Sequence, residues 1–235
     1  MSQGAGADQD ARVFGAIDVG ASGGRVMAGV VSSGAGEARI ELVEIHRFPN
    51  GARESGGALR WDLTGLYDQI LDGLTRLATR YPQTESLGID TWAVDFGAVD
   101  DQGDLLAEPV AYRDDRTAAV IDEVHRLVEP SELYAVNGLQ YLPFNTVYQL
   151  AAERRGNLWG RIDQVLLIPD LIGAWLTGVR RTEITNASTT GLLDAARRRF
   201  SPALFDRLSL PTGLFPPLIE PGRLLGTITP AVADR

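Results

Sequence analysis

The residues best suited to chemistry lie in one stretch, Phe14 to Arg25, which reads F-G-A-I-D-V-G-A-S-G-G-R. An apolar run ends at Asp18, and after Val19 come the small residues Gly20, Ala21, Ser22, Gly23 and Gly24. A glycine turn between two strands can direct several backbone N–H groups at one anion, and the Ser22 hydroxyl adds a donor. Because the Asp18 carboxylate repels phosphate, its natural partner is a divalent cation that it reaches through water. The stretch therefore predicts a cradle for phosphate and magnesium.

Two other interpretations of this stretch remain open. In the first, the glycines serve only the turn of a β-hairpin and bind nothing. In the second, Gly20 to Gly24 spells G-x-S-x-G, the nucleophile elbow of serine hydrolases, which needs a helix after the turn and an acid–histidine pair. A strand pattern follows the turn instead, and the two histidines, His46 and His125, lie in a strand-like run and on a charged helix. The sequence therefore favours the cradle over the hydrolase.

Composition restricts the class of protein. The chain has 235 residues, of which 44% are hydrophobic, so it can bury a sizeable core. Its net charge of −9, without a basic block, argues against nucleic acids and anionic membranes as partners. The absence of cysteine excludes disulfides and thiol chemistry and agrees with a cytoplasmic location. All 22 basic residues are arginine, so the chain has no lysine. This excludes a Walker-type P-loop, whose lysine contacts the phosphates, and Schiff-base chemistry.

The elements that must position these residues follow a recognisable order. Residues 1–11 are small and polar and predict a disordered tail, and three strands joined by short loops follow at about 12–19, 25–32 and 38–48. Apolar residues at helical spacing then predict a helix from an N-cap at Asp62 to Pro82, and 86–99 reads as strand, bend and strand. This order predicts an α/β fold of the ribonuclease H-like (actin-like ATPase) type, with a mixed five-stranded sheet flanked by helices. In that topology Asp18, Asp90 and Asp95 converge on one edge.

Helices dominate the prediction after Tyr112. We expect them at Thr117–Leu127, from a cap at Ser131 to Gly138, at Phe144–Arg155 and at Pro169–Leu176, with a buried strand at Val165–Ile168. Ser201 and Pro202 form an N-cap and first-turn pair that begins another helix. We expect a linker at Pro211–Pro221 and a strand at Leu225–Ile228.

Four stretches resemble the FGGY carbohydrate kinases and, among them, the rhamnulokinases. They are A-I-D-V-G-A-S-G-G-R (Ala16–Arg25), G-I-D-T-W-A-V-D-F-G (Gly88–Gly97), P-V-A-Y-R-D-D-R (Pro109–Arg116) and L-Q-Y-L-P-F-N-T-V-Y-Q-L (Leu139–Leu150). The strings I-P-D-L and T-N-A-S-T-T, beginning at Ile168 and Thr185, support the match. The resemblance runs from about residue 13 to the end. It implies transfer of the γ-phosphate of ATP, with Mg²⁺, to the 1-hydroxyl of L-rhamnulose in rhamnose catabolism.

The resemblance also implies roles for matching residues. Asp18 matches the metal-side carboxylate, and the phosphate loop matches Gly20, Ala21, Ser22, Gly23, Gly24 and Arg25. The sugar side matches Thr91, Trp92 and Ala93, with Asp95 close by. Rhamnulokinases often have Gly where this chain has Ala93 and Ser where it has Gly23. The first difference crowds the sugar slightly, and the second removes a hydroxyl while keeping a permissive backbone.

A sugar site needs flat apolar surface and a few directed hydrogen bonds. Trp92, Tyr141, Phe144, Asn145 and Gln149 supply both, and we include Phe144 and Asn145 among the substrate-binding candidates. Core packing is the alternative for every aromatic residue and is equally plausible for Phe144. The segment Tyr112–Arg116 fits either a surface ion-pair network or a role near the sugar. Asn186 and Thr189 are interpreted as structural.

The resemblance implies a second actin-like lobe that this chain does not contain. FGGY kinases are about twice as long, and their C-terminal lobe carries the catalytic base, an Asp in a motif like H-D-T-A-S, and the adenosine site. That motif is absent here. We therefore expect residues 12–235 to be the N-terminal lobe, without a catalytic base and inactive alone. A kinase for xylulose, fuculose or gluconate, or a non-catalytic sugar-binding lobe, remains the alternative.

Overall fold

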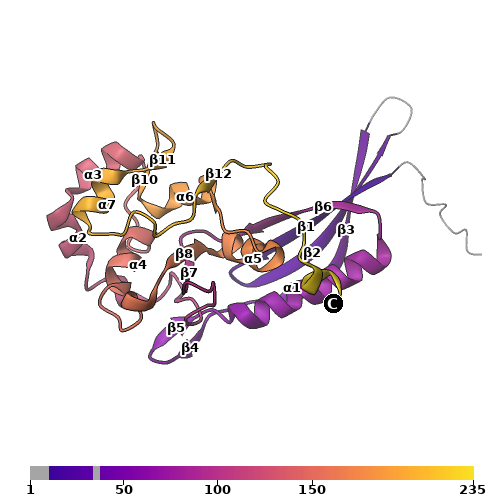
Figure 1. The fold of residues 1–235 in the computed structure, drawn as a ribbon, viewed down its shortest axis with the longest axis horizontal. Helices are drawn as coiled ribbons and strands as arrows, with labels where there is room; N and C mark the ends of the chain where they lie inside the picture. The colour runs from indigo at the N-terminus through magenta and orange to yellow at the C-terminus, as the bar shows by residue number, and fades with distance from the viewer. Residues whose placement is uncertain (1–10, 34–37) are drawn as a thin grey trace, which may run out of the picture. The chain divides into compact units, whose positions relative to one another are not determined.

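A computed structural model of the chain describes residues 11–33 and 38–235 (Figure 1). The tail expected at 1–11 lies outside these residues, apart from Ala11. The chain divides into two compact units, which are described in turn. The first extends to Gly51 and includes Thr64–Thr91 and Arg235, and the second comprises Ala52–Leu63 and Trp92–Asp234. The sequence assigns residues 12–235 to one lobe and predicts no boundary within it.

The first unit contains a mixed four-stranded sheet in the order β3-β2-β1-β6. Its strands are β1 (Arg12–Gly20), β2 (Gly23–Ser33), β3 (Ala38–Pro49) and β6 (Thr84–Thr91). β2 pairs antiparallel with both β1 and β3, whereas β6 pairs parallel with β1. The predicted meander and the strand beside it are confirmed. Among the residues that the structure describes, however, this sheet has four strands and not the expected five.

A sharp bend after β6 explains the strand count. Val94 has a φ of 68°, a left-handed conformation that is costly for a β-branched residue and that ends the extended chain. The next strand, β7 (Phe96–Val99), pairs antiparallel with β8 (Gln164–Leu167) in a separate two-stranded sheet. The backbone of β7 therefore pairs with β8 on one edge and with the segment at Leu105 and Leu106 on the other.

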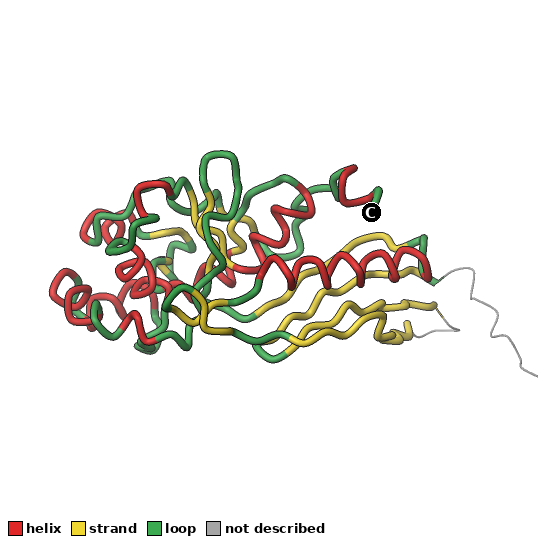
Figure 2. The backbone as a smooth tube through the Cα atoms, turned by 90° about the horizontal axis from the view of Figure 1, so that it is seen from below, coloured by secondary structure: helices red, strands yellow, loops and turns green. Residues whose placement is uncertain are grey.

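Helix α1 (Leu63–Arg80) begins directly after Asp62 and ends before Pro82, as predicted. It runs along one face of the sheet (Figure 2). Alternate residues of β1 on that face are buried, because a strand turns successive side chains to opposite faces. Gly73 permits close contact, since a Cβ there would lie 2.4 Å from Cγ2 of Val26. A side chain at position 73 would therefore require Val26 or the helix to shift.

The second unit contains most of the helices. They are α2 (Ile121–Leu127), α3 (Pro130–Asn137), α4 (Thr146–Glu153), α5 (Ile168–Thr177), α6 (Ile184–Ala187), α7 (Pro202–Arg207) and α8 (Pro230–Ala233). The Ser201 cap is confirmed, because its side chain accepts from the backbone N–H of Leu204. The Ser131 cap is wrong: Glu129 is the N-cap of α3, since Pro130 takes the first helical position that suits its fixed φ. No helix in the described residues is long and apolar enough to cross a bilayer.

Short strand pairs complete the second unit. They are β4 (Arg53–Ser55) with β5 (Ala58–Arg60), β9 (Thr182–Glu183) with β12 (Leu218–Ile219), and β10 (Leu193–Asp194) with β11 (Arg199–Phe200). The linker expected at Pro211–Pro221 is wrong, because Leu214 and Phe215 are buried in the core and β12 pairs with β9. The strand expected at Leu225–Ile228 is also wrong, since this segment forms no ladder with another described segment.

Candidate functional site

The turn predicted to hold phosphate is a two-residue hairpin in the first unit. Ala21 and Ser22 form its tip, and Gly20 lies opposite Gly23. Asn50 fixes the turn: its Nδ2 donates to the carbonyl of Gly20 at 2.9 Å, and its backbone N–H donates to the carbonyl of Ser22 at 3.4 Å. The strand β2 follows directly, so the strand–turn–helix context of a nucleophile elbow is absent here. Sequence reasoning missed Asn50 because it lies 30 residues from Gly20.

Asp18 belongs to a row of charged residues across the sheet. Arg25 lies opposite it on β2, with Nη2 and Nε at 2.7 and 2.8 Å from Oδ2 of Asp18. Arg47 lies beyond Arg25 on β3, and Asp90 lies on the other side of Asp18, on β6. The row therefore has two positive residues followed by two negative ones. Arg25 compensates the charge of Asp18, and Asp90 places a second carboxylate beside it, at the end of β1 that leads into the turn.

Gly24 has a packing function that the sequence does not reveal. A Cβ at this position would lie 2.2 Å from Cε2 of Phe48, inside the ring's van der Waals surface. A Cβ at Gly20 would have the carbonyl oxygen of Gly23 as its nearest neighbour, at 3.5 Å, which is an ordinary contact. Neither glycine has a positive φ. Phe48 thus requires glycine at position 24, whereas packing does not explain glycine at position 20, which is exposed.

The carboxylates of the first unit suit magnesium better than a metal that needs many protein ligands. Mg²⁺ keeps several waters and is usually held by one or two carboxylates together with substrate phosphates. Asp18 and Asp90, adjacent in register, match that donor set. No group of three or more His, Cys, Asp and Glu side chains within the described part of the chain could enclose a metal. Water and phosphate would therefore supply the remaining ligands.

Asp95, in the second unit, is the centre of a buried hydrogen-bond cluster. Its Oδ2 accepts from Nε1 of Trp61 at 2.6 Å, from Nε1 of Trp92 at 2.9 Å and from the backbone N–H of Tyr112 at 3.1 Å. Its Oδ1 accepts from Nε2 of Gln149 at 2.9 Å. Burial raises the pKa of Asp95 above its ordinary value, and these hydrogen bonds oppose the shift. The carboxylate therefore organises the side chains around it and, being fully buried, is not exposed to a ligand.

Hydrogen bonds to Val94 hold the strained bend in place. The carbonyl of Val94 accepts from Oγ1 of Thr146 at 2.7 Å and from Nε2 of Gln149 at 3.3 Å, and both donors belong to α4. The backbone N–H of Asp95 donates to the carbonyl of Ala93 at 2.9 Å. Backbone strain of this kind persists only where the surroundings determine it, as at many binding sites. The bend turns Asp95 inward and leaves Trp92 and Ala93 partly exposed.

Aromatic rings form a row beside Asp95. The ring centroids of Trp61 and Trp92 are 4.4 Å apart, those of Trp61 and Tyr112 are 6.3 Å apart, and those of Tyr112 and Phe144 are 5.5 Å apart. Trp61 is buried, whereas Trp92, Tyr112 and Phe144 are half-buried. The row therefore combines a fixed interior ring with partly exposed faces of the kind that stack against sugars.

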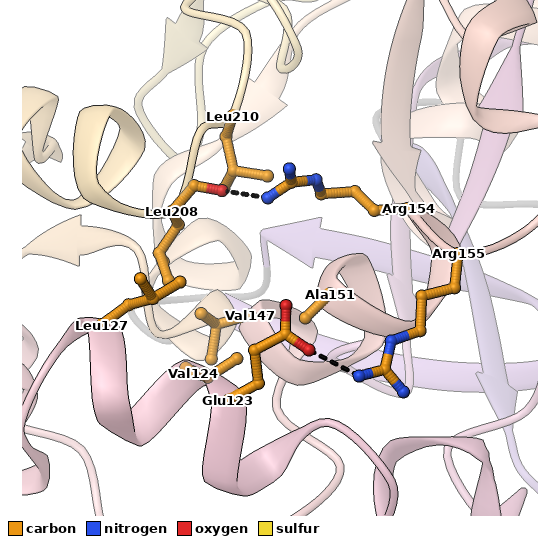
Figure 3. A pocket seen from close by; sticks show the side chains of 9 residues that line it. All are labelled: Glu123, Val124, Leu127, Val147, Ala151, Arg154, Arg155, Leu208 and Leu210. Atoms are coloured by element: carbon orange, nitrogen blue, oxygen red, sulfur yellow. Dashed lines mark hydrogen bonds and ion pairs between the residues drawn. The ribbon is translucent and has the colours of Figure 1, made fainter.

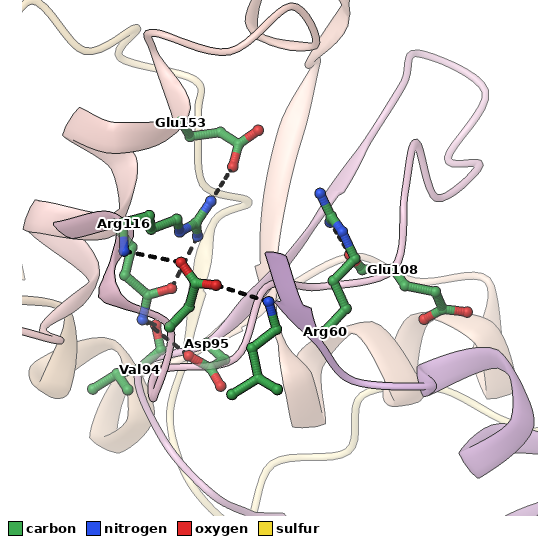
Figure 4. A network of polar contacts seen from close by, with 9 residues as sticks. Arg60, Val94, Asp95, Glu108, Arg116 and Glu153 are labelled. Atoms are coloured by element: carbon green, nitrogen blue, oxygen red, sulfur yellow. Dashed lines mark hydrogen bonds and ion pairs between the residues drawn. The ribbon is translucent and has the colours of Figure 1, made fainter. Parts of the chain in front are cut away.

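Gln149 also contacts Arg116, which forms an ion pair with Glu153 (Figure 4 shows the pair). Nη2 of Arg116 donates to Oε1 of Gln149 at 3.1 Å, and Nη1 of Arg116 lies 2.5 Å from the largely buried carboxylate of Glu153. Asp114 caps the turn before Arg116 and also accepts from the backbone N–H of Leu59 at 2.7 Å. Asp114 and Arg116 therefore hold neighbouring segments in place, and Tyr112 belongs to the aromatic row.

Asn145 and Tyr141, also predicted at the sugar, contact other parts of the second unit. Oδ1 of Asn145 accepts from the backbone N–H of Leu142, and its Nδ2 donates to the carbonyl of Thr189, so both ends of this buried amide bind backbone. Tyr141 packs with His125 and Tyr148 instead of with Trp92. Thr91 ends β6 in the first unit, and Trp92 begins the second. Trp61 was missed, because its sequence position suggests only a helix start.

The family model for the N-terminal domain of the FGGY family of carbohydrate kinases matches residues 13–235. The chain belongs to this family. Among curated relatives, the FGGY chain is 42% identical over 216 residues to the rhamnulokinase of Bacillus subtilis, and 41% identical over 220 residues to that of Enterococcus faecalis. These matches cover 92% and 94% of the chain but only 44% of each relative. The chain therefore spans less than half the length of these relatives.

Solved structures of FGGY-type sugar kinases share the fold. A gluconate kinase from Lactobacillus acidophilus matches with a TM-score of 0.82 at 15% identity, covering 95% of the chain and 45% of that structure. A xylulose kinase from Rhodospirillum rubrum matches with a TM-score of 0.81 at 19% identity, covering 95% of the chain and 46% of that structure. The predicted actin-like α/β fold is confirmed. At these identities the likeness concerns the fold alone.

Proposed function

We propose that this chain is the sugar- and phosphate-binding N-terminal lobe of a rhamnulokinase, which transfers the γ-phosphate of ATP to the 1-hydroxyl of L-rhamnulose. Curated relatives named rhamnulokinase, at 42 and 41% identity, support this choice of sugar over others. The observation that carries the proposal is the Asp95 cluster, in which one buried carboxylate fixes Trp61, Trp92 and the backbone of Tyr112. Such a rigid aromatic wall suits a deoxy sugar with both apolar and hydroxyl surfaces.

On the phosphate side, the proposal assigns Asp18 to magnesium and the residues from Gly20 to Arg25 to the nucleotide phosphates. When bound, Mg²⁺ neutralises charge on the transferred phosphoryl group, and the protein mainly positions the reactants. Arg25, which now pairs with Asp18, can turn its guanidinium to a phosphate oxygen when the cation takes over the carboxylate. Asp90, beside Asp18, adds charge that favours the hydrated cation over free phosphate.

The catalytic base and the adenosine site belong, in this proposal, to a C-terminal lobe of the same enzyme. The chain contains no H-D-T-A-S motif, and its curated relatives extend well beyond it. The lobe described here would bind and orient the sugar, and the base would remove the proton of the 1-hydroxyl. The proposal includes the cytoplasmic location that the composition suggests.

Two measurements on the 235-residue chain test the proposal. Tryptophan fluorescence should change saturably with L-rhamnulose, because Trp61 and Trp92 adjoin the proposed site, and Trp92→Leu should abolish the change. An ATP-dependent phosphorylation assay of the same chain should show no product. Sugar phosphorylation by the isolated chain would reject the assignment of the base to another lobe.

Substrate choice is tested in the enzyme that contains both lobes. The kcat/KM for L-rhamnulose should exceed the values for L-fuculose, D-xylulose, glycerol and D-gluconate. A higher value for any of these would make the protein an FGGY kinase for that substrate. Sugar binding without phosphorylation in the two-lobed protein would instead identify a non-catalytic sugar-binding protein.

A further inference from the structure

A cavity of about 140 Å³ lies among the helices of the second unit (Figure 3). Helices α2 and α4 and the segment after α7 line it, and Val124, Val147, Leu208 and Leu210 form its buried apolar walls. Leu127 stands at its rim with 41% of its surface exposed. The side chains of Glu123 and Arg155 are about half exposed. The cavity therefore has an apolar interior and a solvent-exposed polar rim.

The rim carries a surplus of positive charge. Arg155 lies 2.5 Å from the carboxylate of Glu123, so these two charges compensate each other. Nη1 of Arg154 donates to the carbonyl of Leu208 at 2.5 Å, and no ion pair involves Arg154 within residues 11–33 and 38–235. Figure 3 shows the Arg154 guanidinium directed across the cavity toward the segment that bears Leu208 and Leu210. The Arg154 guanidinium thus lies beside the apolar walls of the cavity and has no carboxylate partner within the described residues.

The walls are held in place by other contacts. Arg207 donates to the carbonyl of Leu127 and pairs with Glu132, which links α7 to the end of α2 and the start of α3. The bond from Arg154 to Leu208 links the end of α4 to the segment after α7. A preformed site loses less conformational entropy on binding than one that must be ordered by its ligand.

We propose that this cavity binds a small monocarboxylate with a compact apolar body. The apolar body lies in the cavity, and the carboxylate contacts the guanidinium of Arg154. A dry cavity of similar volume holds benzene, so a single ring or a short branched chain matches the space. The guanidinium fork is suited to bidentate contact with a carboxylate, and one anion balances the excess charge of the rim. Val147 and Ala151 reach the cavity from α4, the helix that also holds Gln149 on Asp95. A bound carboxylate therefore contacts the helix that positions Asp95.

Benzoate is the probe that tests this site, and benzyl alcohol is its uncharged match. Both are titrated into the 235-residue chain, with NMR shifts of the cavity residues as the readout. We expect benzoate to bind saturably, in the millimolar range. Benzyl alcohol should bind at least about 10-fold more weakly, because it lacks the charge-assisted contact with Arg154. Arg154→Gln should weaken benzoate binding by a similar factor, and the exposed Arg161→Gln should leave it unchanged.

A second variant tests the contribution of the cavity volume to benzoate binding separately from that of the Arg154 charge. Ala151→Leu fills the interior, so it should abolish the benzoate shifts while keeping the spectrum of a folded chain. If that variant does not fold, the smaller change Val147→Ile is measured in its place. The proposal is overturned if benzoate does not saturate below about 20 mM. It is equally overturned if Arg154→Gln binds benzoate as tightly as the parent chain, or if benzyl alcohol binds as well as benzoate.

Discussion

The indole nitrogen of Trp61 lies 2.6 Å from Oδ2 of Asp95, and both side chains are buried. The two residues are 34 positions apart, and Asp95 reaches this contact only because the chain bends at Val94. Trp61 also packs against Trp92 at 4.4 Å between ring centroids. Trp61 thus positions both the carboxylate and the ring that we propose faces the sugar.

Replacing Trp61 with Phe tests this positioning role. The variant keeps an aromatic ring but removes one donor to Asp95, which should lower the free energy of unfolding by about 1–3 kcal/mol. L-rhamnulose should bind more weakly, with Trp92 fluorescence as the readout and urea unfolding as the stability measurement. The control is Trp159→Phe, which also removes an indole, but from a tryptophan that packs against another part of the core. If Trp61→Phe binds L-rhamnulose as tightly as the parent chain, the proposal that Trp61 positions the sugar site is wrong.

Asp18→Asn tests the metal assignment in the enzyme with both lobes. The pair that Asp18 forms with Arg25 is partly exposed, with 42 and 44% of the two side chains accessible, so solvent screens it and the melting temperature should change little. Loss of the charge that holds the cation should cost on the order of a few kcal/mol in the transition state and lower kcat strongly, without changing sugar affinity. Ser22→Ala should cost less, because the backbone donors of the turn remain. Near-normal turnover of Asp18→Asn would contradict the assignment.

Gly24 and Gly20 form a matched pair that separates packing from phosphate binding. Gly24→Ala places a methyl group against the Phe48 ring and should destabilise the chain by about 1–3 kcal/mol in urea unfolding. The double variant Gly24→Ala with Phe48→Leu should recover part of that loss. Gly20→Ala meets no such contact, so it should leave stability nearly unchanged and reduce nucleotide affinity in the two-lobed enzyme. Equal destabilisation by both alanines would contradict this division.

Asp170 should make stability depend on pH. It is buried at the start of α5, where Oδ1 accepts from the backbone N–H of Glu183 at 3.0 Å and Oδ2 has no partner within the described residues. Burial, together with the nearby charge of Glu183, raises its pKa from 3.8 to about 7, against the effect of the hydrogen bond. The folded state therefore holds the proton more tightly than the unfolded state does.

The sign of the effect follows from this difference. The contribution of Asp170 to stability is most favourable below pH 3.8, falls as the pH rises, and levels off above about 7. Asp170→Asn keeps the acceptor for Glu183 and cannot ionise. It should therefore be more stable than the parent chain at pH 8, by on the order of a few kcal/mol, and the advantage should vanish near pH 4. Chemical unfolding across this range measures it, and the exposed Asp206→Asn should show no such trend.

Much of the fold could be predicted from the sequence because its signals are local. Alternating apolar residues predicted β1, β2 and β3, helical spacing predicted α1, and the serine–proline pair at Ser201 predicted the start of α7. The predictions failed where a distant segment decided the outcome. The proline-rich segment at 211–221 looks like a linker by composition, yet β9 offers it a pairing partner and the core buries Leu214.

The sequence by itself determined which chemistry is present: a carboxylate before a small-residue turn, a strand that ends in Asp-Thr-Trp, and no lysine or cysteine. Only the tertiary structure decided which of these residues meet. Asp95 holds its neighbours in place because Trp61 and Gln149, 34 and 54 positions away in the sequence, donate hydrogen bonds to it. Glycine is required at position 24 because the Phe48 ring packs against it. Local patterns reflect hydrogen bonds and burial between near neighbours. Contacts over long sequence distances depend on how whole elements pack, and no short pattern records them.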